Sequence, residues 1–407
     1  MKRKTLWTKN FTIITLGTLI SAIGGVAMNL GISLVVFDQT QSTWLIGVFG
    51  AISMLPGVTL PILLGPVIDR ANRKHVIVAL DALSGLWYLA FLLYVRRFGF
   101  VYAAYLVFSF VLGCIGSVYS LAYSSLYPDL IPDGFEQKGY AVSGVIYPLA
   151  TTLITPLAAL VYARFGVQVL FLIEGVSLLI AAAFESRIDH HHAPRQEAPS
   201  LRQYADDLLE GFRYLKKEKG VRSIYGYMAV TNPASNGIGI MTMAHFQSAP
   251  GLTTAMYGLL TSAETIGRLI GSATHYLIRI PEEKRYQLTV RVYMIYEACD
   301  GAMLFLAYPL MLASRFLCGF LGSQTAAIRQ AAVQKYLPSD MRARVNGLFD
   351  VLVSLGMMAV QLFVGALGEV MAYPVAAALM AGISFAAVLL LIVRNKRLVE
   401  PVYNFRV

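Results

Sequence analysis

Among the ionisable residues inside long apolar runs in the second half of the chain, five could do chemistry together. Glu264 and Arg268 are four residues apart, so on a helix they share one face. Glu297 and Asp300 are three residues apart in the next run, and Arg315 lies near the outer end of the run after it. Charges within membrane spans are costly and commonly mark ion or proton pathways. These five residues are therefore candidates for holding or moving a proton.

The depth of these residues along their runs predicts how they pair. Arg268 and Glu297 lie at similar distances from the hairpin that joins their runs, so we expect Arg268 to pair with Glu297 or with Glu264. Asp300 and Arg315 lie at similar depth on either side of a very short turn, and we expect them to pair. A structural role is favoured for Asp300 and Arg315, whereas structural and coupling roles are equally open for Glu264 and Arg268.

The composition of the chain indicates the elements that carry these residues. Hydrophobic residues make up 57% of the 407 and charged residues 14%, whereas about a quarter of a soluble protein is charged. Runs of about twenty apolar residues are long enough to cross a bilayer as helices. The sequence therefore predicts an all-α membrane protein with twelve transmembrane helices, at 11–37, 44–68, 75–95, 100–127, 138–163, 167–185, 221–247, 253–278, 287–307, 309–335, 343–367 and 373–393.

The positive charges are distributed unevenly between the two ends of these runs. The net charge of +10 could suggest a nucleic-acid partner, but the Lys and Arg residues lie in short gaps between apolar runs, which excludes that interpretation. One side of the expected membrane carries nearly all of them, and the opposite side has only Arg96, Arg97 and Arg164. By the positive-inside rule, both termini are expected in the cytoplasm of a multi-pass protein of the cell membrane.

The two halves of the chain repeat each other at a shift of 206 residues. The pattern Phe-x-x-Gly-x-x-Gly-Ser at 110–117 recurs at 316–323, and Gly31 aligns with Gly237 at the same shift. One shift serves several runs, so chance matching of membrane glycines is the minor explanation. The repeat indicates two sets of six spans in the same orientation, as in parallel-repeat transporters.

The stretch 65–74 joins the second and third runs and has the pattern Gly-x-x-x-Asp-Arg-x-x-Arg-Lys. This pattern resembles the signature that the major facilitator superfamily carries between spans 2 and 3. In that family the signature latches the cytoplasmic ends of the two halves together. The matching residues are Gly65, Asp69, Arg70, Arg73 and Lys74, and the expected partner is Asp350, near the start of the eleventh run. A merely hydrated Asp350 near a helix N-terminus is an equally open alternative.

The resemblance implies two pseudo-symmetric six-helix halves around a central cavity. The expected domains are 1–186, a linker at 187–220, a second half at 221–393 and a cytoplasmic tail at 394–407. Spans 1, 4, 7 and 10 line the cavity in this family, and Pro233 and Gly237 predict a broken or bent seventh span. Each polar group alone is more often a contact between helices. The lining candidates are Asn29, Tyr119, Tyr123, Tyr147, Asn232, Asn236 and Gln324.

The linker has two parts with different patterns. Residues 187–199 are polar and include His190, His191 and His192, for which a solvated loop is favoured over a metal site because adjacent histidines cannot all face one ion. From the expected N-cap Ser200, apolar residues recur at helical spacing through 219, namely Leu201, Tyr204, Leu208, Phe212 and Leu215. We expect an amphipathic helix on the membrane surface or across the floor of the bundle, with a partner-protein site as the secondary alternative.

The order of features is similar to the macrolide-efflux and siderophore-efflux branch of that superfamily. The features are the 65–74 motif, Leu-Ile-Pro-Asp at 130–133, the 200–219 helix and Leu-Pro-x-Asp-x-x-x-Arg-Val at 337–345. The resemblance implies a monomeric secondary exporter of a small amphipathic substrate, driven by protons and working by alternating access. Siderophore or lipid export, import by the same fold, and a receptor or scaffold without transport are the alternatives.

The chain also lacks the patterns that other chemistries need. No nucleophile and base set, zinc spacing or phosphate-binding loop is present in the sequence, so an enzyme or an ATP-driven pump is disfavoured and no cofactor or metal is expected. Glu264 is the leading proton carrier, and Glu174, in the run 167–185, is a weaker candidate.

Overall fold

The computed structural model describes residues 5–132, 134–189, 201–277, 280–338 and 341–405, and these residues form helices joined by short turns. By their contacts they divide into two compact units, each described here by itself. The first unit comprises Met1–Gln39 and Ile52–Arg202, and the second comprises Thr40–Ala51 and Gln203–Val407.

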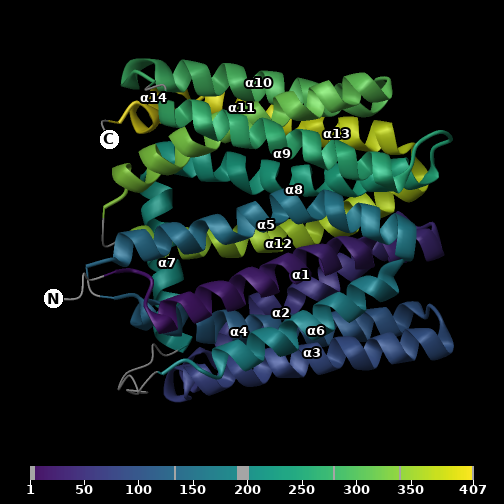
Figure 1. Cartoon of the computed structure of the whole chain (residues 1–407). Helices are drawn as coiled ribbons and strands as arrows, with labels where there is room; N and C mark the ends of the chain where they lie inside the picture. Colours follow the sequence, from purple (N-terminus) through teal and green to yellow (C-terminus); the bar gives the residue numbers. More distant parts are fainter. Residues whose placement is uncertain (1–4, 133, 190–200, 278–279, 339–340, 406–407) are drawn as a thin grey trace. The chain divides into compact units, whose positions relative to one another are not determined.

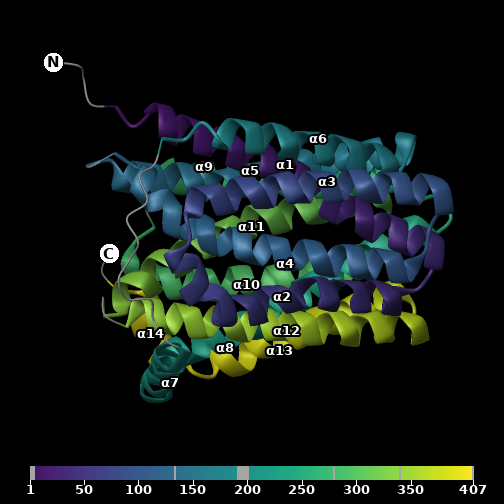
Figure 2. The same ribbon diagram turned by 90° about the horizontal axis from the view of Figure 1, so that it is seen from below.

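Six long helices make up most of the first unit. They are α1 (Lys9–Thr40), α2 (Thr43–Arg70), α3 (Arg73–Phe98), α4 (Tyr102–Leu126), α5 (Glu136–Phe165) and α6 (Val167–Glu185), with a short 3₁₀ turn, η1 (Tyr127–Leu130), after α4. Helix α3 packs along α6 and beside α4, as both views of the chain show (Figures 1 and 2).

Helices α7 to α13 make up most of the second unit. They are α7 (Leu201–Lys217), α8 (Lys219–Ser248), α9 (Thr254–Leu277), α10 (Arg285–Ala302), α11 (Tyr308–Tyr336), α12 (Arg342–Val370) and α13 (Tyr373–Ala387). Short 3₁₀ turns flank α10, at η2 (Glu282–Lys284) and η3 (Met303–Phe305); a π-helical stretch, η4 (Val388–Val393), extends α13, and α14 (Lys396–Tyr403) follows it. The closest neighbours are α9 with α11 and α8 with α13.

Helices dominate because backbone groups have no water to bond within a bilayer, and a helix satisfies them internally. In the described part of the chain, eight helices are long and apolar enough to cross a membrane: α1 to α6, α12 and α13. Helices α8 to α11 carry more polar residues, and among them lie the five ionisable candidates. The outward face of α3 exposes Leu83, Leu86 and Leu93 by 51–66%, as lipid contact requires.

Aromatic side chains form the core of the first unit at one end of α3, α4 and α6. The Phe91 ring stacks on Phe108 at 4.0 Å between centroids and meets Tyr105 and Phe171 edge-on at 4.9 and 5.4 Å. Such offset and edge-on pairs add to the gain from burying the rings. This aromatic cluster fixes α3 against α6. Each of these two helices also carries a buried acid.

The first turns of α2 belong with α12, which explains why Thr40–Ala51 falls in the second unit. Glu369 of α12 accepts hydrogen bonds from the Ser42 hydroxyl at 2.6 Å and from the Trp44 backbone N–H at 3.0 Å. A carboxylate is favoured there because helix N-termini carry unpaired N–H groups and positive dipole ends. Gly47 and Gly365 let the two backbones approach, since a Cβ on Gly365 would meet the Thr43 carbonyl oxygen at 2.8 Å.

Helix α7 lies where the sequence predicts an amphipathic helix, and its contacts with α12 determine which side chains it buries. Arg344 of α12 pairs with Asp207 at 2.7 Å and with Glu210 at 2.9 Å, and a Cβ on Gly211 would lie 2.8 Å from the Arg344 carbonyl oxygen. The close approach at Gly211 turns Leu215 into the core, whereas Phe212 is 58% exposed. A membrane-surface position for α7 stays a prediction.

Other expectations for the linker fall outside the described residues. They concern Ser200 as N-cap, the histidines His190 to His192, and the side chains of Leu201 and Tyr204. At the other end of the second unit, the stretch expected as a tail contains α14, whose Val399, Val402 and Tyr403 are buried in a core cluster with α8.

The structure describes the backbone at two positions where the sequence predicts local features. Helix α8 runs unbroken through Pro233, whose ring packs against Gly356 of α12, so the described helix has no break, and the alternative of a bend stays a prediction. The stretch 65–74, which joins the second and third runs, is mostly helical, because α2 continues to Arg70 and only two residues separate it from α3. Asn72 caps α3 by accepting a hydrogen bond from the His75 N–H at 3.3 Å.

Candidate functional site

Glycines bring α9 and α11 into backbone contact in the second unit. A Cβ on Gly319 would lie 1.9 Å from the carbonyl oxygen of Glu264, and a Cβ on Gly267 would lie 2.1 Å from that of Phe316. A Cβ on Gly271 would similarly meet the Phe320 carbonyl oxygen at 2.6 Å. Small residues at such spacing allow membrane helices to pack closely. The packing places side chains near Gly319 directly beside Glu264.

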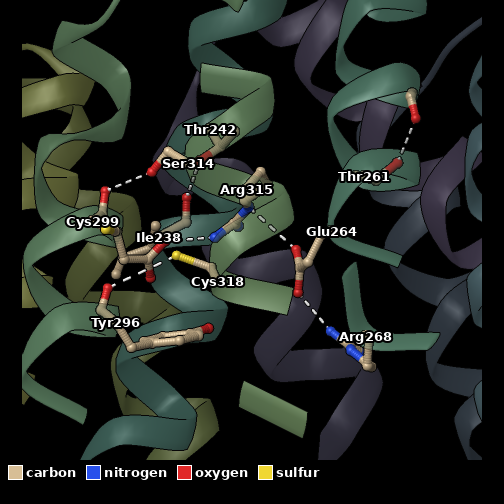
Figure 3. Close-up of polar contacts among 12 residues, drawn as sticks. Ile238, Thr242, Thr261, Glu264, Arg268, Tyr296, Cys299, Ser314, Arg315 and Cys318 are labelled. Atoms are coloured by element: carbon tan, nitrogen blue, oxygen red, sulfur yellow. Dashed lines mark hydrogen bonds and ion pairs between the residues drawn. The ribbon is translucent and has the colours of Figure 1, made fainter. Parts of the chain in front are cut away.

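An alternating chain of four charges follows from this packing, called here the ion-pair chain: Arg268, Glu264, Arg315 and Asp300. Arg315 lies one turn before Gly319, and its Nε is 3.2 Å from Glu264 Oε2 (Figure 3). Its Nη1 bonds Asp300 of α10 at 2.5 Å, and Arg268 Nη2 bonds Glu264 Oε1 at the same distance. Two positive and two negative charges thus balance one another across three helices.

The members of the ion-pair chain differ sharply in exposure. Asp300 is 1% and Arg315 11% exposed, whereas Glu264 is 20% and Arg268 51% exposed. Buried charges need such pairing because each ion has lost its hydration. Glu264 is therefore the more accessible acid of the ion-pair chain, while Asp300 depends on Arg315 for its solvation.

The expected pairings can be compared directly with this arrangement. Asp300 pairs with Arg315 as expected, and of the two alternatives for Arg268 the structure has Glu264. The second partner of Arg315, Glu264, was not foreseen. Glu297 stands apart from the chain: it is 4% exposed, and its Oε2 has no hydrogen-bond partner among the described residues. Whether any of these five residues couples transport to an ion stays a prediction.

Contacts between α10 and α11 hold the buried end of the ion-pair chain in place. The Ser314 hydroxyl donates to the Cys299 carbonyl oxygen at 3.2 Å, next to Arg315 (Figure 3). The Cys318 thiol points to the Tyr296 carbonyl oxygen at 3.9 Å. These bonds fix the register of the two helices, so that Arg315 faces Asp300.

A polar cavity of about 240 Å³ lies between α8, α11 and α12 of the second unit. Its wall includes Arg329, Asp350, Asn346, Gln334 and Tyr225. The Tyr225 hydroxyl donates to Asn346 Oδ1 at 2.7 Å, and Arg329 Nη1 donates to the Tyr293 hydroxyl at 3.0 Å. Asp350, expected as half of the latch, thus lines a cavity within its own unit.

The other residues of the expected latch are only partly described. Arg73 is 3% exposed and donates through Nη1 to the Ser125 carbonyl oxygen and to Asp129 Oδ2, both at 3.2 Å. It therefore ties the start of α3 to the end of α4 within the first unit. The surroundings of Gly65 and the side chains of Asp69 and Arg70 lie outside what the structure describes, and Lys74 is half-buried.

The residues expected to line a cavity fall into three groups. Tyr119 and Tyr123 stack at 6.0 Å, and Thr18 of α1 donates to the Tyr123 hydroxyl at 3.1 Å, so these two residues are brought together. The amides bond within the second unit: Gln324 donates to the Gly271 carbonyl oxygen at 2.6 Å, and Asn236 accepts from Gln361 at 3.4 Å. The remaining residues are not gathered with these: Asn29 and Tyr147 are exposed and Asn232 is half-buried.

Two buried acids of the first unit escaped the sequence interpretation. Asp81 of α3 and Glu185 of α6 are 5% and 0% exposed and hydrogen-bond to each other. Glu174, the weaker candidate, is 3% exposed and faces Gly24 of α1, where an added Cβ would overlap its Oε2. The available signal was the same as in the second half, an acid inside or at the edge of an apolar run.

No metal centre accompanies these acids. The described residues contain no group of three or more His, Cys, Asp and Glu side chains that could hold a metal ion.

A family model matches almost the entire chain. Residues 11–296 and 298–404 match the model described as Major Facilitator Superfamily. The chain belongs to the major facilitator superfamily. It is a multi-pass membrane transporter rather than an enzyme, and the expected all-α major facilitator fold is confirmed. No curated protein sequence is significantly similar to it.

Solved structures of the same fold include transporters of different cargoes. The nucleoside transporter NupG is 14% identical, with a TM-score of 0.70 over 95% of this chain and 98% of that one. The POT family transporter PepTSo is 12% identical, with a TM-score of 0.66 over 96% and 98%. A bacterial homologue of the iron transporter ferroportin is 17% identical, with a TM-score of 0.67 over 99% and 100%. At these identities the likeness shows the fold alone.

Proposed function

We propose that this transporter is a proton-coupled exporter of small amphipathic compounds, with both termini in the cytoplasm and Glu264 as the coupling acid. The observation that supports it is the unequal exposure within the ion-pair chain. Glu264 is 20% exposed while bonded to two arginines, and Asp300, at 1%, is sealed behind Arg315. A proton can therefore arrive at Glu264 from water without first opening the α10–α11 contact.

The proposed mechanism follows from what protonation would change in the ion-pair chain. A neutral Glu264 no longer attracts Arg268 and holds Arg315 less strongly, while Asp300 keeps Arg315 bonded. The α9 side of the chain thus loosens, and the α10 side stays fixed. In alternating access, such a change in pairing shifts the equilibrium between the inward-facing and outward-facing conformations. The shift arises because the protonated and the ionised forms of Glu264 favour different sets of contacts.

The test is transport in proteoliposomes with an imposed pH gradient and a lipophilic cationic probe. We expect the gradient to accelerate probe movement in the wild type. The Glu264→Gln variant is expected to lose that acceleration by about tenfold, within the usual range of a coupling free energy. The matched control is Glu283→Gln, which changes an exposed acid in η2.

Three outcomes would be informative. Equal acceleration in wild type and Glu264→Gln would assign Glu264 a structural role. No gradient effect in the wild type would remove proton coupling from the proposal. Movement of the probe only in the inward direction would replace export by import.

We also propose that the motif Gly65, Asp69, Arg70, Arg73 and Lys74 works with Asp350 as a latch between the two halves during transport. Support comes from the family membership and from the motif residue Arg73. Arg73 pairs with Asp129 and so fixes the start of α3. We expect Asp69→Asn to slow transport severalfold while membrane insertion stays normal. Asp189→Asn, which removes an exposed partner of Lys9, serves as the control. An unchanged rate in Asp69→Asn would leave the motif with a role in topology alone.

A further inference from the structure

Asp81 and Glu185, neither of them an expected site residue, form a buried pair of carboxyl groups in the first unit. Asp81 is on α3 and Glu185 is the last residue of α6, and these helices pack along each other (Figures 1 and 2). The two side chains are hydrogen-bonded to each other and are at most 5% exposed. The pair lies on different helices from the ion-pair chain and in the other unit.

A hydrogen bond between two carboxyl groups requires a proton. An ionised carboxylate only accepts hydrogen bonds, so one member of the pair must be a protonated acid that donates to the other. Two adjacent carboxylates cannot both ionise in a site of low dielectric, because their repulsion adds to the cost of desolvating each charge. The geometry is therefore that of a shared proton.

The surroundings of the pair supply no alternative counter-charge. The groups that face it are the Tyr119 hydroxyl of α4, 3.5 Å from Glu185 Oε1, together with Tyr123 of α4 and Glu174 of α6. Within the described residues, no Lys, Arg or His is bonded to either acid or is among the charges that act on it. A metal ion does not fit either, since these residues offer no set of three ligands.

Two further observations show that the pair is unsatisfied as it stands. Asp81 Oδ2 and Glu185 Oε2 are both fully buried, and neither has a hydrogen-bond partner among the described residues. On the α1 side Gly17 faces the pair, and an added Cβ there would overlap Glu185 Oε1. Buried polar atoms normally find partners, so two buried carboxyl oxygens without one mark a place where something binds. The missing partner fits the smallest available ligand, a proton.

We infer that Asp81 and Glu185 are a second proton-binding site of this transporter, which holds one proton between them. Loss of the proton leaves two buried negative charges with only tyrosine hydroxyls near them. Release therefore requires water or a cation to reach the pair, and this needs the contact between Gly17 of α1 and Glu185 of α6 to open. The existence of the site stands on its own, whereas its use in coupling rests on the proposed function.

Infrared spectroscopy of the purified transporter in lipid nanodiscs tests the inference, because a protonated carboxylic acid has its own carbonyl stretching band. We expect the wild type to keep such a band at neutral pH. Both Asp81→Asn and Glu185→Gln are expected to lose band area equal to one carboxyl group per chain. In each variant the new amide donates to the remaining carboxylate, which replaces the shared proton and allows the protein to fold. Glu283→Gln serves as the control and should leave the band unchanged.

The outcomes separate this site from the proposed function. Unchanged band area in Asp81→Asn and Glu185→Gln overturns the shared proton. A pH titration of the wild-type band gives a second measurement that needs no variant: a band component lost at the titration point of exposed carboxyl groups also overturns it. If the band behaves as expected but a pH gradient does not drive transport, the proton site stands and the proposed coupling fails.

Discussion

Replacing Arg315 with leucine is expected to destabilise the transporter more than any other single charge removal in the ion-pair chain. Arg315 is 11% exposed and bonds both Asp300, at 1%, and Glu264. Its loss leaves the fully buried Asp300 carboxylate without a counter-charge. In other proteins such a loss lowers the free energy of unfolding by about 3–5 kcal/mol. Unfolding in detergent, followed by circular dichroism at increasing denaturant, should show this loss. The residual protein should insert poorly.

Matched variants distinguish burial from charge in this experiment. Arg268→Leu removes an equal charge from the same chain, but Arg268 is 51% exposed, so we expect a loss of about 1 kcal/mol or less. Adding Asp300→Asn to Arg315→Leu should recover much of the stability, because no buried charge is then left unpaired. Equal losses in Arg268→Leu and Arg315→Leu would show that the Asp300 carboxyl is already neutral and needs no partner.

The sequence predicts the helices well because apolar length alone decides them. The run 100–127 became α4, Tyr102–Leu126, and the run 167–185 became α6, Val167–Glu185, both among the helices apolar enough to cross a membrane. A bilayer demands about twenty apolar residues per helix, so the ends of these runs are visible without knowledge of the packing. Apolar length does not predict how a surface helix packs. In α7, the close approach at Gly211 determines which face is buried and leaves Phe212 exposed.

Pairs within the candidate site were predictable only where spacing or depth determines them. Glu264 and Arg268 meet because they are four residues apart on one helix, and Asp300 and Arg315 meet across a short turn. The bond from Arg315 to Glu264 depends on how closely α9 and α11 approach, and no periodicity encodes that distance. The Asp81–Glu185 pair is harder still, because the two acids lie in different runs, far apart in the chain, and neither spacing nor a short turn relates them.

Two buried acidic sites in separate units also suggest how the molecule distributes its charge. In the ion-pair chain Glu264 and Asp300 are neutralised by arginines, and in the Asp81–Glu185 pair a proton performs the same task. Both solutions remove net charge from the apolar interior, but the second depends on a proton alone. Arginine stays charged under all physiological conditions, so the ion-pair chain can respond only through Glu264, its partly exposed acid.

Adding a single methyl group at Gly319 is expected to break the contact on which the ion-pair chain depends. The Cβ of Gly319→Ala would lie 1.9 Å from the carbonyl oxygen of Glu264, which is backbone and cannot swing aside. Helices α9 and α11 must separate, and the bond from Arg315 to Glu264 then lengthens. We expect a loss of about 2–3 kcal/mol in the free energy of unfolding, as for other overpacked sites.

The control for this substitution is Gly382→Ala on α13, where an added Cβ meets no atom within 4 Å. Alanine favours helices over glycine, so Gly382→Ala should keep or slightly raise stability. Unfolding of both variants in the same detergent gives the comparison. The higher helix propensity of alanine stabilises both variants in the same direction. Any difference between their free energies of unfolding therefore measures the steric contact at Gly319. Equal stability of the two variants would mean that α9 and α11 approach less closely than the chain of Glu264, Arg315 and Asp300 requires.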